Sequence, residues 1–375
     1  MEPPLFFISA GDPSADNATV RLINALRELL PDSRFMGLGG PRMNAAGQEQ
    51  LASPRDLAVL GFWEVARKYG YFRRLMHRCV DEIASRRPAA VVLVDYPGFN
   101  LRLAARIRQL GIPIIYYISP QVWAWGHRRV KQIRNLVDLM LLILPFEEPF
   151  YEASGVSCRY VGHYLLEDIP ESLINSTPPT EAGLAVLPGS REQEVVRMLP
   201  TMARAAERWC RTSGGKAVIA GITGLVDYDS LLSGIDRSRL EIVFDHPRDV
   251  VSQAALALVA SGTATLETGI INRPMVVVYK TGWLTFQIAR RLVKLDTIAL
   301  VNLVLGQKVA PELIQHQAVP ERIAGQLNRL WNDNSAYESC REAFGRLPEI
   351  LKGTGASRRA ASEIANFLTA RGGER

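Results

Sequence analysis

Cysteine and long hydrophobic runs are scarce in this sequence, and their scarcity excludes several classes of protein. The 375 residues include 4 cysteines, Cys79, Cys158, Cys210 and Cys340, whose spacing fits neither a metal site nor a disulfide framework. We therefore expect no metal and a reducing compartment. The sequence has no run of about 18 apolar residues, which a membrane-spanning helix would need. Met1 is not followed by a basic stretch and an apolar run, so we also expect no signal peptide.

The composition is that of a globular protein with two domains. Apolar residues make up 47% and charged residues 22% of the chain, which are not the values of a disordered protein. A length of 375 residues exceeds one ordinary hydrophobic core and predicts two domains. The net charge of +6 favours an anionic partner, which could be a nucleotide, a nucleic acid or a membrane.

The first half alternates between apolar strands and amphipathic helices. We predict strands at residues 5–10, 34–38, 89–94, 114–118 and 139–144, and helices at 17–30 and 101–110. This alternation is typical of a doubly wound α/β domain, in which ligands bind at the carboxyl ends of the strands. The first turn, residues 11–16, lacks the G-x-G-x-x-G pattern, so a dinucleotide is not indicated.

An acidic residue, Asp95, directly follows the central strand at 89–94. Beside buried apolar neighbours its carboxyl could have the raised pKa of a general base. The alternative is that Asp95 caps the helix at 101–110. Because Pro97 and Gly98 intervene, Asn100 is the better candidate for that cap.

Residues 57–80 interleave aromatic and basic side chains, among them Phe62, Trp63, Tyr71, Phe72, Arg67, Arg73, Arg74 and Arg78. Such a segment suits the headgroup region of an anionic bilayer. A helix packed on the sheet, with its basic side chains directed outward, explains the same pattern. A nucleic-acid groove is less favoured because no recognisable motif accompanies the charges, so we expect no nucleic-acid partner.

The strand–helix alternation restarts after a polar, proline-containing linker at 168–182. A strand at 184–187 is followed by a turn in which Gly189 and Ser190 open a helix N-terminus. Arg191 adds a forked cation that suits a phosphate. The D-x-D spacing at 227–229 resembles that of metal-dependent sugar transferases, but no strand precedes it, and we interpret it as solvated surface.

A second turn of this kind, Ser261-Gly262-Thr263, lies between a strand at 256–259 and a helix at 264–271. It offers backbone N–H groups and the positive end of a helix dipole to an anion. Glu267 follows Thr263 by one helical turn and could reach a ribose hydroxyl beside a phosphate held there. The alternative is that the Ser and Thr side chains merely cap the helix, although two such turns in one domain make that coincidence less plausible.

Seven short motifs occur in a characteristic order. They are Gly40-Pro41-Arg42-Met43, Asp95-Tyr96-Pro97-Gly98-Phe99-Asn100, Ser119-Pro120-Gln121-Val122-Trp123-Ala124-Trp125, Leu144-Pro145-Phe146-Glu147, Leu187-Pro188-Gly189-Ser190-Arg191, Ala260-Ser261-Gly262-Thr263-Ala264-Thr265-Leu266-Glu267 and Pro311-Glu312-Leu313. In this order they resemble the lipid-A-disaccharide synthase family, glycosyltransferases of bacterial lipid A assembly.

The resemblance implies an α/β fold of the GT-B type, with two doubly wound Rossmann-like domains facing a central cleft. Residues 1–167 would form the acceptor- and membrane-facing domain, and 168–182 the linker. Residues 183–345 would bind the UDP-sugar, and helices at 346–375 would pack back on the first domain.

The resemblance further implies transfer of 2,3-diacylglucosamine from UDP to the 6-hydroxyl of 2,3-diacylglucosamine 1-phosphate, with inversion and without a metal or cofactor. Asp95 would be the general base. The donor-binding residues would be Ser190, Arg191, Ser261, Gly262 and Thr263 at the phosphates, Glu267 at the ribose, and Asn302. The protein would lie in the cytoplasm, peripheral on the inner face of the inner membrane and docked through residues 57–80. Whether it forms a homodimer is left open by the sequence.

Several positions depart from the family pattern. Asp12 and Ala15 replace Glu and Gly in the first turn, Tyr164 and Val301 replace prolines, and Gln307 stands where a charged residue is common. An alanine Cβ disfavours positive φ, so the first turn should be restricted. These departures leave open a UDP-sugar enzyme with another acceptor, a 2-epimerase of the same fold, or a homologue that binds UDP-sugar without turnover.

Overall fold

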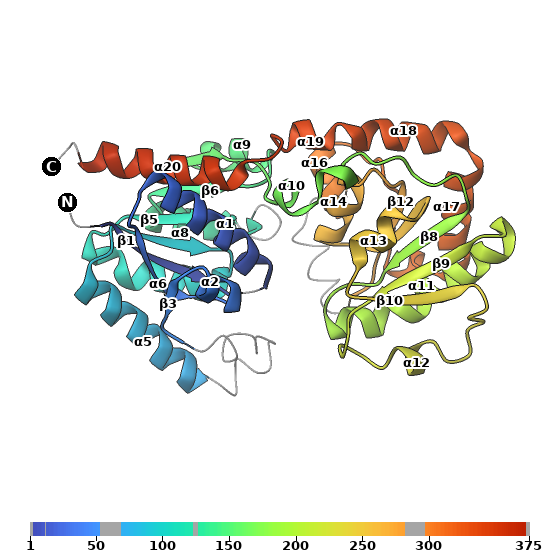
Figure 1. The fold of residues 1–375 in the computed structure, drawn as a ribbon, viewed down its shortest axis with the longest axis horizontal. Coiled ribbons are helices and arrows are strands. Elements are labelled where there is room, and N and C mark those ends of the chain that lie inside the picture. The colour runs from blue at the N-terminus through green and yellow to red at the C-terminus, as the bar shows by residue number, and fades with distance from the viewer. Residues whose placement is uncertain (1–2, 12, 53–68, 123–126, 282–296, 373–375) are drawn as a thin grey trace. The chain divides into compact units, whose positions relative to one another are not determined.

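The computed structural model describes residues 3–11, 13–52, 69–122, 127–281 and 297–372, and the chain forms two compact units (Figure 1). The first unit comprises Met1–Tyr164 together with Lys352–Arg375, and the second comprises Leu165–Leu351. The segment predicted as a linker, 168–182, therefore belongs to the second unit. That unit begins with α10 (Leu165–Asp168) and η2 (Glu171–Leu173).

The first unit is built on a seven-stranded parallel sheet in the order β3-β2-β1-β4-β5-β6-β7. The strands are β1 (Leu5–Ala10), β2 (Arg34–Leu38), β3 (Gln48–Gln50), β4 (Ala90–Val94), β5 (Ile114–Tyr117), β6 (Leu139–Leu142) and β7 (Cys158–Tyr160). Every residue of β1, β4, β5 and β6 is buried, as expected for parallel strands that are covered on both faces. The strand order reverses between β1 and β4, which places the ligand-binding switch point of this sheet there.

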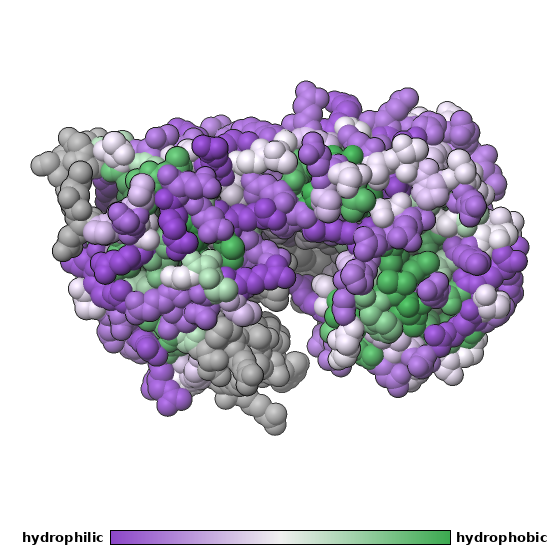
Figure 2. Space-filling model, viewed as in Figure 1, coloured by the Kyte–Doolittle hydropathy of each residue, from purple (hydrophilic) through white to green (hydrophobic). Residues whose placement is uncertain are grey.

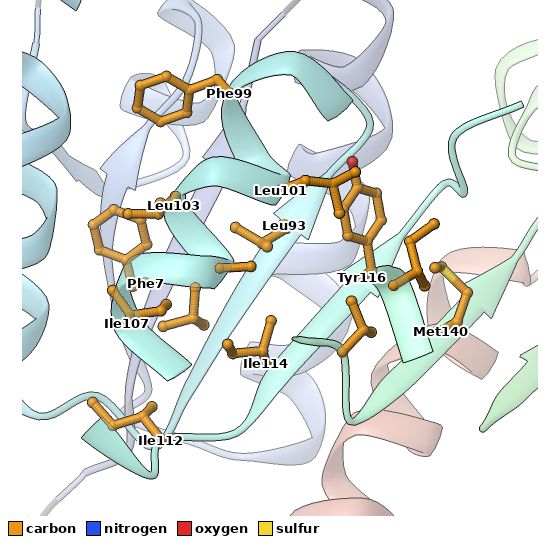
Figure 3. Packing of buried hydrophobic residues seen from close by; sticks show 14 of the residues in the cluster. Phe7, Leu93, Phe99, Leu101, Leu103, Ile107, Ile112, Ile114, Tyr116 and Met140 are labelled. Carbon is orange, nitrogen blue, oxygen red and sulfur yellow. The ribbon is translucent and has the colours of Figure 1, made fainter. Parts of the chain in front are cut away.

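Helices cover the sheet of the first unit. They are α1 (Pro13–Leu29), α2 (Pro41–Ala45), α5 (Tyr69–Arg86), α6 (Pro97–Ile107) with η1 (Arg108–Leu110), α8 (His127–Leu136), α9 (Glu147–Ala153) and α20 (Ala356–Gly372). Figure 3 shows Leu103 and Ile107 of α6 near Phe7 of β1; Phe99, one turn before Leu103, belongs to the same buried cluster. The C-terminal helix α20 lies beside α1 in Figure 1, so the two ends of the chain complete one unit.

The second unit contains a six-stranded parallel sheet in the order β10-β9-β8-β11-β12-β13. The strands are β8 (Gly183–Leu187), β9 (Lys216–Gly221), β10 (Leu240–Phe244), β11 (Leu256–Ala260), β12 (Met275–Tyr279) and β13 (Glu312–Ile314). The helices are α11 (Glu192–Ser213), α12 (Tyr228–Leu231), α13 (Pro247–Ser252), α14 (Thr263–Ile270), α16 (Leu300–Leu305), η3 (Gln315–Gln317), α17 (Pro320–Asn332), α18 (Asn334–Gly345) and α19 (Leu347–Ile350). The switch point of this sheet lies between β8 and β11.

Two helices begin earlier than the sequence pattern predicts. Helix α1 starts at Pro13 instead of residue 17, and α6 starts at Pro97 instead of residue 101. Proline is well suited to the first helical turn because its φ is already helical and its missing N–H has no partner to lose there. The prediction that Asn100 caps α6 is therefore wrong, because Asn100 lies within the helix and Tyr96 occupies the cap position.

Helix α5 explains part of the aromatic–basic segment. Leu75 and Met76 are buried in the core and Phe72 packs against it, whereas Arg73 and Arg74 are exposed. Residues 69–80 thus form a helix packed on the unit with basic side chains outward, and 57–68 lie outside the described residues. In Figure 2, hydrophilic side chains cover much of the viewed face of both units. Within the described chain, no helix is long and apolar enough to cross a bilayer.

Candidate functional site

The two turns predicted to bind an anion follow adjacent strands of the second sheet. Strands β8 and β11 are paired in parallel, with Leu187 opposite Val259. The turn at Ser190 therefore starts at the same sheet edge as the turn at Ser261. This edge is the switch point, where doubly wound sheets bind their ligands.

The first turn opens the long helix α11. Gly189 has a φ of 120°, a conformation that a side chain would strain, and Ser190 is exposed. Arg191 is the N-cap residue in extended conformation and makes no side-chain cap, which leaves the first N–H groups of α11 accessible to an anion. Its side chain is 81% exposed, and its Nη1 lies 3.0 Å from Glu194 Oε1.

The second turn is fixed by hydrogen bonds of Ser261, and the two residues after Ser261 are exposed to solvent. The Ser261 N–H donates to the Val278 carbonyl at 2.9 Å, and the Ser261 hydroxyl donates to the Ile298 carbonyl at 3.2 Å. Gly262 is the N-cap of α14, and the position that a Cβ would take has no neighbour within 4 Å among the residues that the structure describes. Gly262 and Thr263 are both exposed.

A carboxylate that the sequence pattern did not single out supports this turn. Glu312 accepts hydrogen bonds from the N–H groups of Ile298 (2.9 Å) and Ala299 (3.2 Å) and from the Thr297 hydroxyl. It thereby fixes the 297–299 segment, whose Ile298 carbonyl receives the Ser261 hydroxyl. Glu312 also lines a cavity of about 280 Å³. The one signal in the sequence was its place in the Pro311-Glu312-Leu313 motif.

Asn302, predicted from the resemblance to bind the donor, is fully buried. Its amide donates to the Ala310 carbonyl and to Glu312 Oε1, both at 2.8 Å. Its oxygen accepts from the N–H groups of Val309 (3.0 Å) and Ala310 (2.9 Å). Both donors and both acceptor positions are thus used within the protein. This geometry favours a structural role for Asn302, which shapes the loop before β13, over direct contact with a ligand.

Glu267, predicted to bind ribose, lies on α14 one turn past Thr263, with 21% of its side chain exposed. Its Oε1 lies 2.5 Å from Nε of Arg248, which belongs to α13. The sequence pattern did not indicate Arg248, because this partner comes from a different helix.

Asp95 lies at the switch point of the first sheet. Asp95 and Tyr96 have φ values of 45° and 47°, which cost a non-glycine residue about 1–2 kcal/mol each. The backbone is held in this conformation: the Asp95 N–H donates to the Tyr117 carbonyl at 3.1 Å, and its carbonyl accepts from the Tyr116 hydroxyl at 2.5 Å. Burial, and then the nearby Asp95 charge, hold the pKa of Tyr116 well above its usual value, so the phenol stays a neutral donor.

Buried Asn100 joins the two strands at this switch point. Its amide donates to the carbonyls of Asp95 (2.8 Å), Val94 (3.1 Å) and Ser9 (3.3 Å), and its oxygen accepts from the Ser9 hydroxyl at 2.7 Å. Asn100 therefore ties the end of β1 to the end of β4 and holds the Asp95 backbone.

The first turn of the chain is organised by Asp16. Its buried carboxylate accepts from the N–H groups of Gly40 (3.0 Å), Arg42 (3.2 Å) and Met43 (3.1 Å) and so caps α2 from another helix. Ala15 lies inside α1 and is not among the residues with positive φ, so its Cβ is accommodated without strain in the conformation described. Asp12 lies outside the described residues.

A second buried pair lies at the ends of β5 and β6. The Ser119 hydroxyl donates to Glu147 Oε1 at 2.5 Å, and both side chains are buried. Glu147 thereby fixes the start of the loop that carries Trp123 and Trp125, which are themselves outside the described residues.

The described residues contain no group of three His, Cys, Asp or Glu side chains that could hold a metal. The D-x-D segment lies at the surface: Asp227 caps α12, and Asp229 is 82% exposed and pairs with Arg237. All four cysteines are buried and free.

Two parallel-sheet α/β units with turns at their switch points define the two-domain fold of GT-B glycosyltransferases and related epimerases. A calicheamicin glycosyltransferase aligns with a TM-score of 0.63 at 18% identity, covering 98% of this chain and 99% of its own. A putative UDP-N-acetylglucosamine 2-epimerase from Listeria monocytogenes aligns with a TM-score of 0.67 at 11% identity, covering 100% and 98%. Identities this low show the fold alone.

The sequence comparisons are more specific. The family model described as lipid-A-disaccharide synthetase matches residues 6–345. The lipid-A-disaccharide synthase of Anaeromyxobacter dehalogenans (strain 2CP-C) is 42% identical over 370 residues, covering 96% of this chain and 97% of its own. That of Myxococcus xanthus (strain DK1622) is 38% identical over 378 residues, covering 98% of each. The chain belongs to the lipid-A-disaccharide synthase family, and its reaction is glycosyl transfer.

Proposed function

We propose that the protein transfers 2,3-diacylglucosamine from UDP to the 6-hydroxyl of 2,3-diacylglucosamine 1-phosphate, forming a β-1,6-linked disaccharide 1-phosphate and UDP. Membership of the family supports this reaction. The observation that carries it is the parallel pairing of β8 with β11, which brings the Ser190 and Ser261 turns to one sheet edge.

The second unit holds the donor. Arg191, Ser190 and the turn from Ser261 to Thr263 bind the UDP phosphates through a guanidinium, hydroxyls and backbone N–H groups. Glu267 binds the ribose. The hydrogen-bond donors at the phosphates stabilise the charge that develops on the departing UDP, which is the role that a metal plays in other sugar transferases.

Asp95 is the general base. Its carboxylate takes the proton of the acceptor 6-hydroxyl while that oxygen attacks the anomeric carbon and the bond to UDP breaks. Attack on the face opposite the leaving group inverts the anomeric configuration. A positioned base of this kind typically contributes about 10²–10⁴ in rate. The backbone bonds to Tyr116, Tyr117 and Asn100 support the assignment, because they fix the residue at the switch point.

The substrates carry acyl chains, and the protein meets them on the cytoplasmic face of the inner membrane. The exposed Arg73, Arg74 and Arg78 of α5 would face anionic headgroups. Residues 57–68, the rest of the predicted docking segment, lie outside the described residues. Sedimentation velocity of the full-length protein would test whether a homodimer forms.

The deciding experiment measures UDP release from UDP-2,3-diacylglucosamine with and without 2,3-diacylglucosamine 1-phosphate. We expect release to require both substrates and to yield a disaccharide. UDP-sugar binding with no acceptor-dependent release, or epimerisation of the donor sugar, would contradict the proposal.

A further inference from the structure

Arg248 is held at two points near the proposed ribose site. Its Nε donates to Oε1 of Glu267 at 2.5 Å, and its Nη1 donates to the carbonyl of Asp168 at 2.5 Å. The three residues come from α13, α14 and α10. Because the guanidinium is planar and rigid, two such bonds fix both its position and its orientation.

This contact leaves one side of the Glu267 carboxylate available. A carboxylate has two acceptor oxygens, and Arg248 contacts Oε1. Oε2 makes no hydrogen bond to any other residue that the structure describes. The side chain is 21% exposed, so it is accessible to a ligand without being free to turn in solvent. A sugar hydroxyl, which donates a hydrogen bond, suits the remaining oxygen.

Exposed ion pairs usually contribute little, which makes the second contact of Arg248 informative. A simple surface pair would not need a backbone carbonyl from a third element. Here the Asp168 carbonyl anchors the guanidinium, and the guanidinium in turn anchors Glu267. Binding sites lose affinity when their contacting groups are not held by neighbouring residues.

We infer that Arg248 is a positioning residue that directs Oε2 of Glu267 toward the ribose hydroxyls of the uridine nucleotide. This inference rests on the proposed function, in which Glu267 binds the ribose. It predicts that removal of Arg248 weakens recognition of the ribose hydroxyls in particular, and leaves contacts to the phosphates in place.

The test compares the affinities of UDP and 2′,3′-dideoxy-UDP by calorimetry on the full-length protein. We expect the unmodified protein to prefer UDP by about tenfold or more, the scale of one good hydrogen bond to a charged group. Glu267→Gln should abolish most of this preference. Arg248→Gln should reduce it to within about threefold of that variant, and Arg248→Lys should be intermediate, because an ammonium cannot span both acceptors.

Arg237→Gln is the matched control, because it removes an arginine–aspartate pair elsewhere in the same unit, and it should leave the preference unchanged. General damage to the fold would weaken both nucleotides equally and would not alter their ratio. If Arg248→Gln does not fold, Arg248→Lys carries the test. A full preference in both Arg248 variants, with the preference lost in Glu267→Gln, would overturn the inference alone. A full preference in Glu267→Gln would instead remove Glu267 from the ribose and overturn that part of the proposed function too.

Discussion

Asp95 shows how the fold prepares a reactive residue at the end of a strand. Its positive φ is unfavourable for a side chain, and the conformation persists because Tyr116, Tyr117 and Asn100 satisfy its backbone. Strain retained in this way at a ligand-binding edge is typical of functional residues. The sequence indicated the residue, whereas its conformation and its supporting bonds came from the structure.

Asp95→Asn should lower kcat by about 10²–10⁴, because the amide cannot accept the acceptor's proton, and should leave UDP affinity unchanged. Turnover and calorimetric UDP binding check the two parts. Asp245→Asn is a matched control, since Asp245 also follows a strand and has a φ of 64°. Undiminished turnover in the Asp95 variant would remove the residue from the reaction.

His163 gives the protein a dependence of stability on pH. The imidazole is 2% exposed and stacks on Tyr164, with 4.8 Å between ring centroids. Burial lowers its pKa from 6.5 to about 3, so the native state keeps it neutral while the unfolded state binds a proton. Its contribution to stability is therefore fully present above pH 6.5 and is lost as the pH falls toward 3.

The free energy of unfolding in urea should be lower at pH 5 than at pH 6.5, because this pH range lies between the lowered pKa of His163 in the native state and its ordinary pKa of 6.5. One proton bound by the unfolded state costs up to about 1.4 kcal/mol per pH unit. His163→Gln should remove that part of the pH dependence, and His77→Gln on the exposed side of α5 should not. Equal slopes for the His163 variant and the unmodified protein would contradict the assignment.

The departures from the family pattern are accommodated in the second unit as well as the first. Val301 is buried, and its N–H lies 3.4 Å from the Thr265 hydroxyl, a contact that a proline could not make. Gln307 is exposed, so a neutral side chain in place of a charged one leaves no buried charge without its partner.

At the scale of elements, the donor site depends on how short segments are fixed against one another. The segment 297–299 has no regular structure, and Glu312 of β13 holds its N–H groups while Ser261 holds its Ile298 carbonyl. Helix α14 and β13 are therefore connected through side chains as well as through the sheet.

Glu312→Gln should raise the donor KM and lower the melting temperature, because an amide presents an N–H₂ group to donors that need an acceptor. Hydrogen bonds to a charged group contribute about 1.5–3 kcal/mol, which sets the scale of the stability loss. The measurements are donor titrations and thermal unfolding. Glu321→Gln, which breaks a surface pair with Arg208, should change neither. A Glu312 variant with normal KM and stability would show that the segment is held by other contacts.

At the scale of the whole molecule, α5 packs apolar side chains on the first unit and exposes basic side chains to solvent. Leu75 and Met76 are buried in the first unit, so they cannot insert into a bilayer while the protein is folded. In the proposed docking on a membrane, α5 would therefore contribute mainly the charges of its exposed Arg73, Arg74 and Arg78.

Replacing these three arginines with glutamine should weaken binding to anionic vesicles by about 1 kcal/mol per charge, or roughly a hundredfold in all, and should leave the salt dependence shallower. Vesicle co-sedimentation at two salt concentrations measures both. The control replaces three exposed basic residues of α8, Arg129, Lys131 and Arg134, which changes the net charge equally. Equal release by both triple variants would show that net charge, and not α5, determines binding.

The sequence by itself determined the α/β class, most strands and the two turns. Buried parallel strands are continuous apolar runs, as in β4 and β12, and Gly-Ser and Ser-Gly-Thr turns have a composition that is set locally. The motif order was specific enough to indicate the family. Each strand, turn and motif resides in a few consecutive residues.

Only the tertiary structure decided which of these segments meet. Ser9 and Asn100 are 91 positions apart, and the partners Arg248 and Glu267 belong to different helices, so no local pattern could pair them. Asn302 was predicted from the resemblance to bind the donor, and in the structure its side chain makes hydrogen bonds to Val309, Ala310 and Glu312 that no local pattern indicated. Turn chemistry and periodicity act over a few residues, whereas the neighbours of a buried polar group depend on the order of strands in the sheet and on side-chain packing.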